Sequence, residues 1–271
     1  MVEDNQMQAL PQSENNILMM MNAALAVPGV KVNREAFLVE KFHMTTDQIK
    51  HGRPQDFFSE ADINKVARES INRNVLSSAG ASTLTGIPGG IAMAATIPAD
   101  IMQNMGFSIR LSQELGYIYG YDNILDPKGK LTEEGQQQLI LFLGVMFSAQ
   151  GAGSIVRVMS KNASVYLSKK IMNAALTKTW WYPLLKSISK VVASKTLTKQ
   201  GLARITTKAV PIVGGVLSGG LTFATMRPAA DRLRSELAKN LNYTQDAFDA
   251  DFEVVSSMIE KFDEAAETAL D

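Results

Sequence analysis

The fold of this chain is decided by the stretch PADIMQNMGFSIRLSQELGYIYG, residues 98–120. Its large apolar residues fall on nearly every face of a helix, and a helix of that kind belongs in the core of a protein. Beyond Asp100 its only charges are Arg110 and Glu114, which lie one helical turn apart and can pair. We therefore expect a central, buried helix.

The ends of this stretch carry residues suited to helix ends. Pro98 and Asp100 favour a helix start, where the missing proline N–H costs nothing and a carboxylate meets the positive end of the dipole. Gly120 favours a helix end. Tyr117 and Tyr119 can bury their rings while their hydroxyls stay at the rim. We interpret all five residues as structural.

A second central helix is predicted downstream. Thr132 is a suitable N-cap, and Glu133 and Glu134 follow it in the first turn. Residues 139–147 are almost all large and apolar. This helix too should lie inside the molecule.

Three further helices are predicted toward the N-terminus. Ser13 precedes an apolar run that stops at Pro28-Gly29, Asn33 can cap a short helix that ends at Phe42, and Ser59 precedes a helix that reaches about Ala79. Strand signals are scarce. The sequence therefore predicts an all-α, bundle-like single domain of mostly antiparallel helices. Within it we expect an N-terminal helix or extension (1–30), a main helical domain (31–242) and an acidic C-terminal helix (243–271).

Two glycine-rich segments are expected at the centre of the bundle. Small residues spaced four apart let helix backbones approach closely. The structural motif residues of the two segments are Gly86, Pro88, Gly89 and Gly90 in the first, and Pro211, Gly214, Gly215, Gly219 and Gly220 in the second. In each segment a glycine pair is followed, after seven residues, by Pro-Ala: Gly89-Gly90 by Pro98-Ala99, and Gly219-Gly220 by Pro228-Ala229. We interpret the two segments as matching helix contacts, with chance similarity as the alternative.

Charge is strongly segregated along a chain whose formal net charge is zero. Residues 135–230 contain no Asp or Glu but twelve Lys or Arg, and shorter helices are expected there at about 163–178, 183–194, 198–206 and 211–225. Such a block makes a positive face that attracts anionic surfaces, unless the flanking acids cover it.

Both tryptophans lie inside this basic block. Adjacent indoles beside lysines suit a membrane interface, where each Lys near an anionic bilayer contributes about 1 kcal/mol. The candidate contact residues are Lys169, Lys170, Lys178, Trp180, Trp181, Tyr182, Lys186 and Lys190. The alternatives are buried aromatic rings with solvated lysines, and nucleic acid, which the diffuse lysines and missing recognition motif do not favour.

The C-terminal segment carries a heptad seam. From Thr244 onward there are nine acids and one lysine, and apolar residues are spaced four and three apart. The predicted seam consists of Phe248, Phe252, Val255, Ile259 and Phe262. It either docks on its own domain, with its acids offsetting the basic block, or serves as a detachable arm or a dimerisation helix that makes a homo-oligomer.

Three stretches without charged residues are candidates for membrane spans: 74–99, 135–156 and 209–226. The third is shorter than the ~20 apolar residues of a span, and the others contain Gly and Pro or open on polar residues. Buried helices explain all three, with insertion of 74–99 as an alternative. The acidic N-terminus lacks a signal-peptide pattern, and there is no cysteine, so we expect a cytoplasmic protein.

Motifs that would identify an enzyme are missing from the sequence. No phosphate loop, hydrolase elbow or complete dinucleotide fingerprint is present. Glu40-x-x-His43 has the spacing of di-iron bundles, but His51 lacks the matching glutamate. We therefore predict no catalytic residue, no metal site and no cofactor, with an unrecognised enzyme or small-molecule carrier as an alternative.

Several strings together resemble the EcsC family of bacterial proteins over about residues 30 to 242. They are Gly86-Ile-Pro-Gly-Gly90, Thr96-Ile-Pro-Ala-Asp100, Leu115-Gly-Tyr-Ile-Tyr-Gly-Tyr-Asp122, Phe142-Leu-Gly-Val-Met-Phe147 and Pro211-Ile-Val-Gly-Gly-Val-Leu-Ser-Gly-Gly220. The resemblance implies an all-helical bacterial protein without an assigned reaction, and it carries over no catalytic residue.

Together these observations predict a non-enzymatic protein that associates peripherally with a membrane or a membrane protein through its basic, Trp-containing region. A soluble scaffold that uses the C-terminal seam, a small-molecule-binding protein and a membrane-inserting helical protein are the alternatives.

Overall fold

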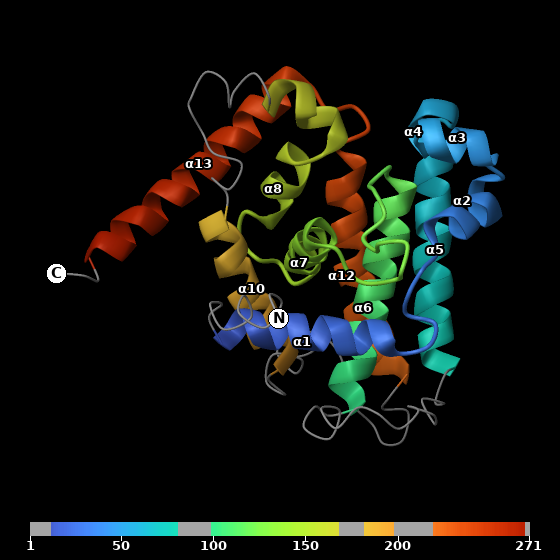
Figure 1. The fold of residues 1–271 in the computed structure, drawn as a ribbon, viewed down its shortest axis with the longest axis horizontal. Helices are drawn as coiled ribbons and strands as arrows, with labels where there is room; N and C mark the ends of the chain where they lie inside the picture. The colour runs from blue at the N-terminus through green and yellow to red at the C-terminus, as the bar shows by residue number, and fades with distance from the viewer. Residues whose placement is uncertain (1–11, 81–98, 168–181, 198–218, 269–271) are drawn as a thin grey trace.

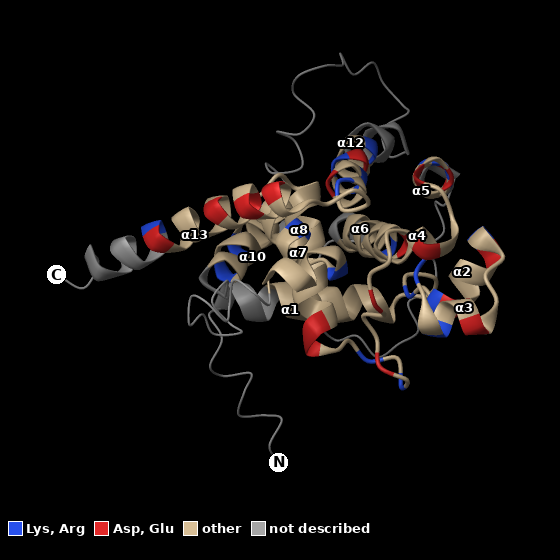
Figure 2. Cartoon of the chain, turned by 90° about the horizontal axis from the view of Figure 1, so that it is seen from above, with Lys and Arg blue, Asp and Glu red and all other residues tan. Residues whose placement is uncertain are grey.

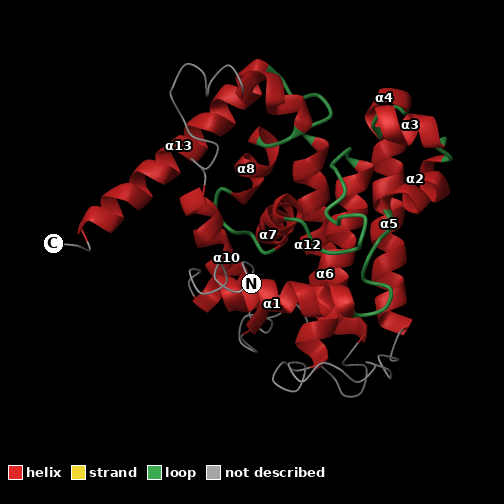
Figure 3. Cartoon of the chain, in the orientation of Figure 1, coloured by secondary structure: helices red, strands yellow, loops and turns green. Residues whose placement is uncertain are grey.

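The computed structural model describes residues 12–80, 99–167, 182–197 and 219–268 (Figure 1). In this part of the chain helices are joined by loops and no strand occurs (Figure 3). The pairing of Leu125 with Leu131 is an isolated antiparallel bridge within a turn. The predicted all-α single domain is confirmed.

Five helices make up the N-terminal part: α1 (Gln12–Ala26), α2 (Arg34–Phe42), α3 (Thr46–His51), α4 (Pro54–Phe57) and α5 (Glu60–Gly80). Asn33 caps α2 as predicted, because its Oδ1 accepts the Ala36 N–H at 2.9 Å. The predicted start of α5 is also confirmed, since Ser59 Oγ accepts the Asp62 N–H at 3.2 Å. The short helices α3 and α4 were not predicted.

The two central helices lie where the sequence predicts them. α6 (Ala99–Ile118) packs against α1, α5, α7 and α12. It ends in a left-handed turn at Gly120, whose φ is +80°, and Tyr121 N–H donates to Gly116 O at 2.9 Å. α7 (Glu133–Met146) begins with Thr132 accepting the Gly135 N–H at 3.0 Å.

The basic block and the C-terminus form α8 (Ala152–Val158), a 3₁₀ turn (Lys161–Ala163), α10 (Tyr182–Leu197), α12 (Gly219–Ala238) and α13 (Gln245–Thr268). The sequence predicts a helix ending at about 225, but α12 continues through Pro228. Pro228 is exposed, whereas Met226, Ala229 and Ala230 are buried. Packing of α12 against α5, α6 and α7 therefore outweighs the cost of an internal proline.

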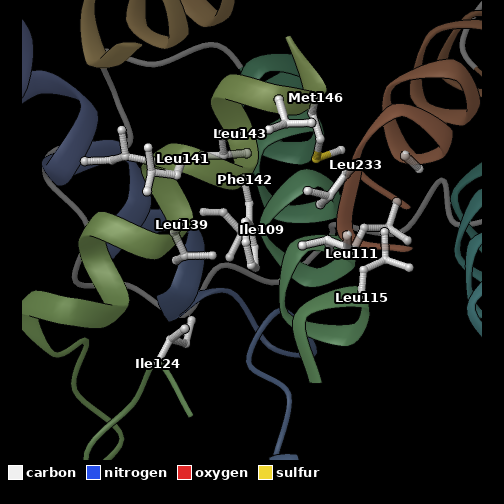
Figure 4. Close-up of a cluster of buried hydrophobic side chains, with 14 of the residues drawn as sticks. Ile109, Leu111, Leu115, Ile124, Leu139, Leu141, Phe142, Leu143, Met146 and Leu233 are labelled. Carbon is white, nitrogen blue, oxygen red and sulfur yellow. The ribbon is translucent and has the colours of Figure 1, made fainter. Parts of the chain in front are cut away.

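The hydrophobic core lies where α6, α7 and α12 meet. Ile109, Leu111 and Leu115 come from α6, and Leu233 from α12 (Figure 4). α1 contributes to the same core through Ile17, Met20, Met21 and Ala24. α10 packs on α1 and α7, and α13 packs mainly on α8 and then extends beyond the body of helices (Figure 1). These contacts place α8, α10 and α13 on one side of the molecule.

Candidate functional site

Six of the twelve basic residues in the acid-free block, residues 135–230, lie in the part of the chain that the structure describes. These residues are Arg157, Lys161, Lys186, Lys190, Lys195 and Arg227. The remaining six lie outside the described residues, among them Lys169, Lys170 and Lys178. Trp180 and Trp181 also lie outside them, and the side chain of Tyr182, the first residue of α10, is not described.

Acids from outside the block cover three of the described basic residues. Lys161 Nζ lies 2.7 Å from Asp122 Oδ1. Arg227 lies 3.9 Å from Asp231 Oδ2. Arg157 pairs with Glu236 and with Asp251. Flanking acids therefore pair with these three residues: Asp122 and Asp251 come from distant segments, whereas Asp231 lies one turn from Arg227 on α12.

Arg157 joins three helices through its guanidinium group. Its Nε donates to Asp251 Oδ2 of α13 at 2.7 Å, and its Nη1 contacts Glu236 Oε2 of α12. Tyr243 OH donates to the same Asp251 Oδ2 at 2.8 Å. Burial alone would raise the pKa of Asp251, but the hydrogen bonds from Arg157 and Tyr243 hold it below its usual value. Arg157 is thus a structural link between α8, α12 and α13.

Two exposed lysines of the block lie on α10. One face of this helix is buried through Leu184, Leu185, Ile188, Val192 and Ala193. Lys186 and Lys190, one turn apart, are exposed on the opposite face. Figure 2 shows basic positions in blue on α10. Neither pairs with an acid among the described residues. Amphipathic spacing therefore presents two uncompensated positive charges directly after Trp180-Trp181 in the chain.

Lys195, near the end of α10, behaves differently. Its Nζ donates to the carbonyl oxygen of Phe147, after α7. Burial and the charge of Arg232 lower the pKa of Lys195 below its usual value. This lysine is therefore oriented by the fold, and it adds positive charge next to α12.

The C-terminal seam lies partly against the domain. Phe248 and Val255 are fully buried, and Phe252 is nearly so. Ile259 packs on the core as a partly exposed residue, and the side chain of Phe262 is not described. The N-terminal part of the seam is thus occupied within the chain. A homo-oligomer through this helix stays a prediction.

Of the residues interpreted as structural, Tyr117, Tyr119 and Gly120 are buried. Tyr117 and Tyr119 are buried, and their hydroxyls donate to Asn123 Oδ1 at 3.0 Å and to Asn64 Oδ1 at 2.7 Å. Burial raises the pKa of each to about 12. Gly86, Pro88, Gly89, Gly90, Pro98, Pro211, Gly214 and Gly215 lie outside the described residues. The side chain of Asp100 is not described, and Gly219 and Gly220 begin α12.

A small cavity lies beside Gly120, and no sequence motif indicated it. It measures about 110 Å³ and is lined by Gln55, Gln138 and Asn240 among others. A Cβ atom at Gly120 would lie 2.4 Å from Gln55 Nε2 and would displace that side chain, and the φ of +80° favours glycine at this position. The two cations that line the cavity, Arg53 and Lys161, are each engaged by an aspartate.

Neither a metal cluster nor a membrane span is found in the described residues. No group of three or more histidine and acidic side chains could hold a metal ion there. His43 is exposed and forms the left-handed C-cap of α2. Across the same ranges, every helix is too short or too polar to cross a bilayer.

No family model, no curated protein and no solved structure matches the chain. The resemblance to the EcsC family therefore stays a prediction and assigns no residue a role.

Proposed function

We propose that this protein is non-enzymatic and associates peripherally with an anionic membrane surface, using the exposed lysine face of α10 and the tryptophans that precede it. The observation that carries the proposal is the pair Lys186 and Lys190. They are exposed, one turn apart, and unpaired among the described residues. Two exposed, unpaired lysines contribute almost nothing to the stability of the folded domain, so stability does not explain their position.

The magnitudes favour a weak and reversible contact. Two lysines near an anionic surface supply about 2 kcal/mol in total. Stable anchoring requires a second contribution, and the adjacent Trp180-Trp181 pair supplies an interfacial apolar group. Because these charges are exposed, binding should weaken as salt shortens the Debye length to about 8 Å at physiological ionic strength.

Vesicle flotation tests the proposal. The full chain should float with phosphatidylcholine vesicles that contain phosphatidylglycerol and should stay behind with pure phosphatidylcholine. Replacing both lysines (K186Q/K190Q) should weaken binding by roughly 30-fold, which corresponds to about 2 kcal/mol.

The matched control neutralises two exposed cations elsewhere. Lys65 and Arg68 lie on the exposed face of α5. The K65Q/R68Q variant loses the same total charge and should float like the unaltered protein. Equal binding by both double variants, or no flotation of the unaltered protein with anionic vesicles, would exclude this function.

A further inference from the structure

An open groove of about 410 Å³ lies between the α7–α8 loop, α8, α12 and α13. Four basic side chains line it: Arg157 from α8, Arg232 and Lys239 from the α12 region, and Lys261 from α13. Three of the four come from outside the acid-free block. The groove therefore collects cations that the linear charge pattern does not connect.

Carboxylates neutralise only part of this charge. Glu236 lines the groove, contacts Arg157 and lies 2.8 Å from Lys239 Nζ. Asp251 holds the other side of Arg157. Among the described residues, Arg232 and Lys261 pair with no acid. Four cations thus face two engaged carboxylates, which leaves the groove net positive.

The neighbouring positive charges oppose one another. Burial, together with the charge of Arg157, lowers the pKa of Lys239 even though Asp251 acts in the opposite direction. Burial lowers the pKa of Arg232, and both burial and Arg232 lower the pKa of Lys195. An anion placed between these groups would relieve their repulsion.

Small residues keep the groove open. Its lining includes Gly151, Gly153, Ser148, Ser154 and Ser257. A Cβ atom on Gly153 would lie 3.0 Å from Glu236 Oε2 and 3.2 Å from Arg157 Nη1, so a larger residue there would press on the ion pair. Ser257 Oγ donates to Val254 O at 3.0 Å, and Ser154 Oγ accepts from Arg157 Nη2 at 3.2 Å. The Ser148 hydroxyl is the neutral donor that the groove offers beside its charged groups.

We propose that this groove binds a phosphate group, with Arg232 and Lys261 as its charged ligands and the Arg157–Glu236–Asp251 cluster as its fixed frame. Guanidinium and ammonium groups beside hydroxyl donors are the set that recognises phosphate oxygens. The volume admits a phosphorylated small molecule or the headgroup of a phospholipid. The groove does not contain Lys186 or Lys190, so this proposal stands apart from the membrane contact of α10.

Two phosphate sources are distinguished by two probes. Calorimetry with sn-glycerol 3-phosphate measures binding of a soluble phosphomonoester, and flotation with phosphatidylcholine vesicles that contain phosphatidic acid measures binding of the same group on a lipid. The R232Q/K261Q variant should weaken binding of the productive probe about ten-fold for each cation removed. Both replaced side chains are exposed, so the variant should fold, and circular dichroism checks this.

Three controls make the outcome decisive. K186Q/K190Q should leave the glycerol phosphate affinity unchanged, and so should K65Q/R68Q, which removes the same charge from α5. Saturating glycerol phosphate should also raise the unfolding temperature of the unaltered protein and not of R232Q/K261Q.

Loss of calorimetric binding in R232Q/K261Q alone supports a soluble phosphate ligand, even if no vesicle ever floats the protein. Loss of flotation in R232Q/K261Q without any calorimetric signal supports a lipid headgroup in the groove. If R232Q/K261Q behaves like the α5 control with both probes, the proposal is overturned, whatever K186Q/K190Q does.

Discussion

Two charged clusters in this protein are built in opposite ways. In the first, Glu114 of α6 has a fully buried side chain and lies 3.0 Å from Arg110 Nε, one turn away on the same helix. In the second, Arg157 of α8 meets Asp251 of α13, 94 positions away. Their side chains are 13 % and 12 % exposed. The Arg110–Glu114 pair follows from the spacing of the two residues on one helix. The Arg157–Asp251 pair forms only when the fold brings α8 and α13 together.

The two clusters differ in which helices supply the partners of the buried charge. Glu114 also accepts hydrogen bonds from α5, from Ser70 and from Asn74 at 2.7 Å, so it fixes two adjacent central helices. Arg157 fixes the position of α13 relative to α8 and α12. Loss of the first should therefore weaken the whole core, whereas loss of the second should weaken mainly one side.

The largest effect is expected for Glu114→Gln. This change leaves the Arg110 charge without its buried partner, and breaking a buried pair costs about 3–5 kcal/mol. The thermal midpoint, followed by circular dichroism, should fall by roughly 10 °C, at about 2–4 °C per kcal/mol for a chain of this size. Glu69→Gln, at an exposed position on α5, is the control and should change little. A small effect of E114Q would show that Arg110 is compensated from elsewhere.

Arg157→Gln should have the next largest effect. It leaves Asp251 and Glu236 without their shared cation, at a cost of about 2–3 kcal/mol because the site is partly exposed. Limited proteolysis should cut within α13 well before the core helices. Arg234→Gln, which removes a cation of α12 paired to Asp231 at 3.3 Å, should not release α13. Simultaneous cleavage of all helices would mean that Arg157 supports the whole core.

Acid should act on the second cluster through Asp251. Its pKa lies below the usual value in the folded protein, so its stabilisation is fully present above about pH 4 and is lost as the pH falls through the folded pKa. Asp251→Asn should reduce the difference in thermal midpoint between pH 6 and pH 3. Asp249→Asn, an exposed acid of α13, should keep the full difference.

The smallest effect is expected for Arg73→Gln. Its side chain is 41 % exposed, and its Nη2 lies 3.5 Å from Glu114 Oε2. Exposed pairs are worth up to about 1 kcal/mol, so the thermal midpoint should fall by no more than about 4 °C. A loss as large as that of E114Q would assign the main compensation of Glu114 to α5 instead of α6.

The sequence predicted the elements whose causes are local. Asn33, Ser59 and Thr132 cap their helices because a short polar side chain reaches the N–H three residues ahead. The short helices α3 and α4 were not predicted, because helices of this length are too short to show a helical spacing of apolar residues. The end of α12 was misjudged because Pro228 is a local signal, and packing overrode it.

The candidate sites were predictable only in part. The spacing of Lys186 and Lys190 could be read from the sequence, since lysines four apart share a helix face. The phosphate groove could not, because its cations belong to α8, α12 and α13 and no pattern links them. Counting charge along the chain also missed that Asp122 and Asp251, from distant segments, pair with Lys161 and Arg157.

What the amino-acid order determined by itself is therefore the helical class, the helix starts and the pair Arg110–Glu114, because hydrogen bonds and contacts within a few residues suffice for them. What only the tertiary structure decided is which basic side chains remain uncompensated. Coulomb interactions depend on distance in space, and folding brings acids from either end of the chain to some of these cations while leaving Lys186, Lys190, Arg232 and Lys261 exposed.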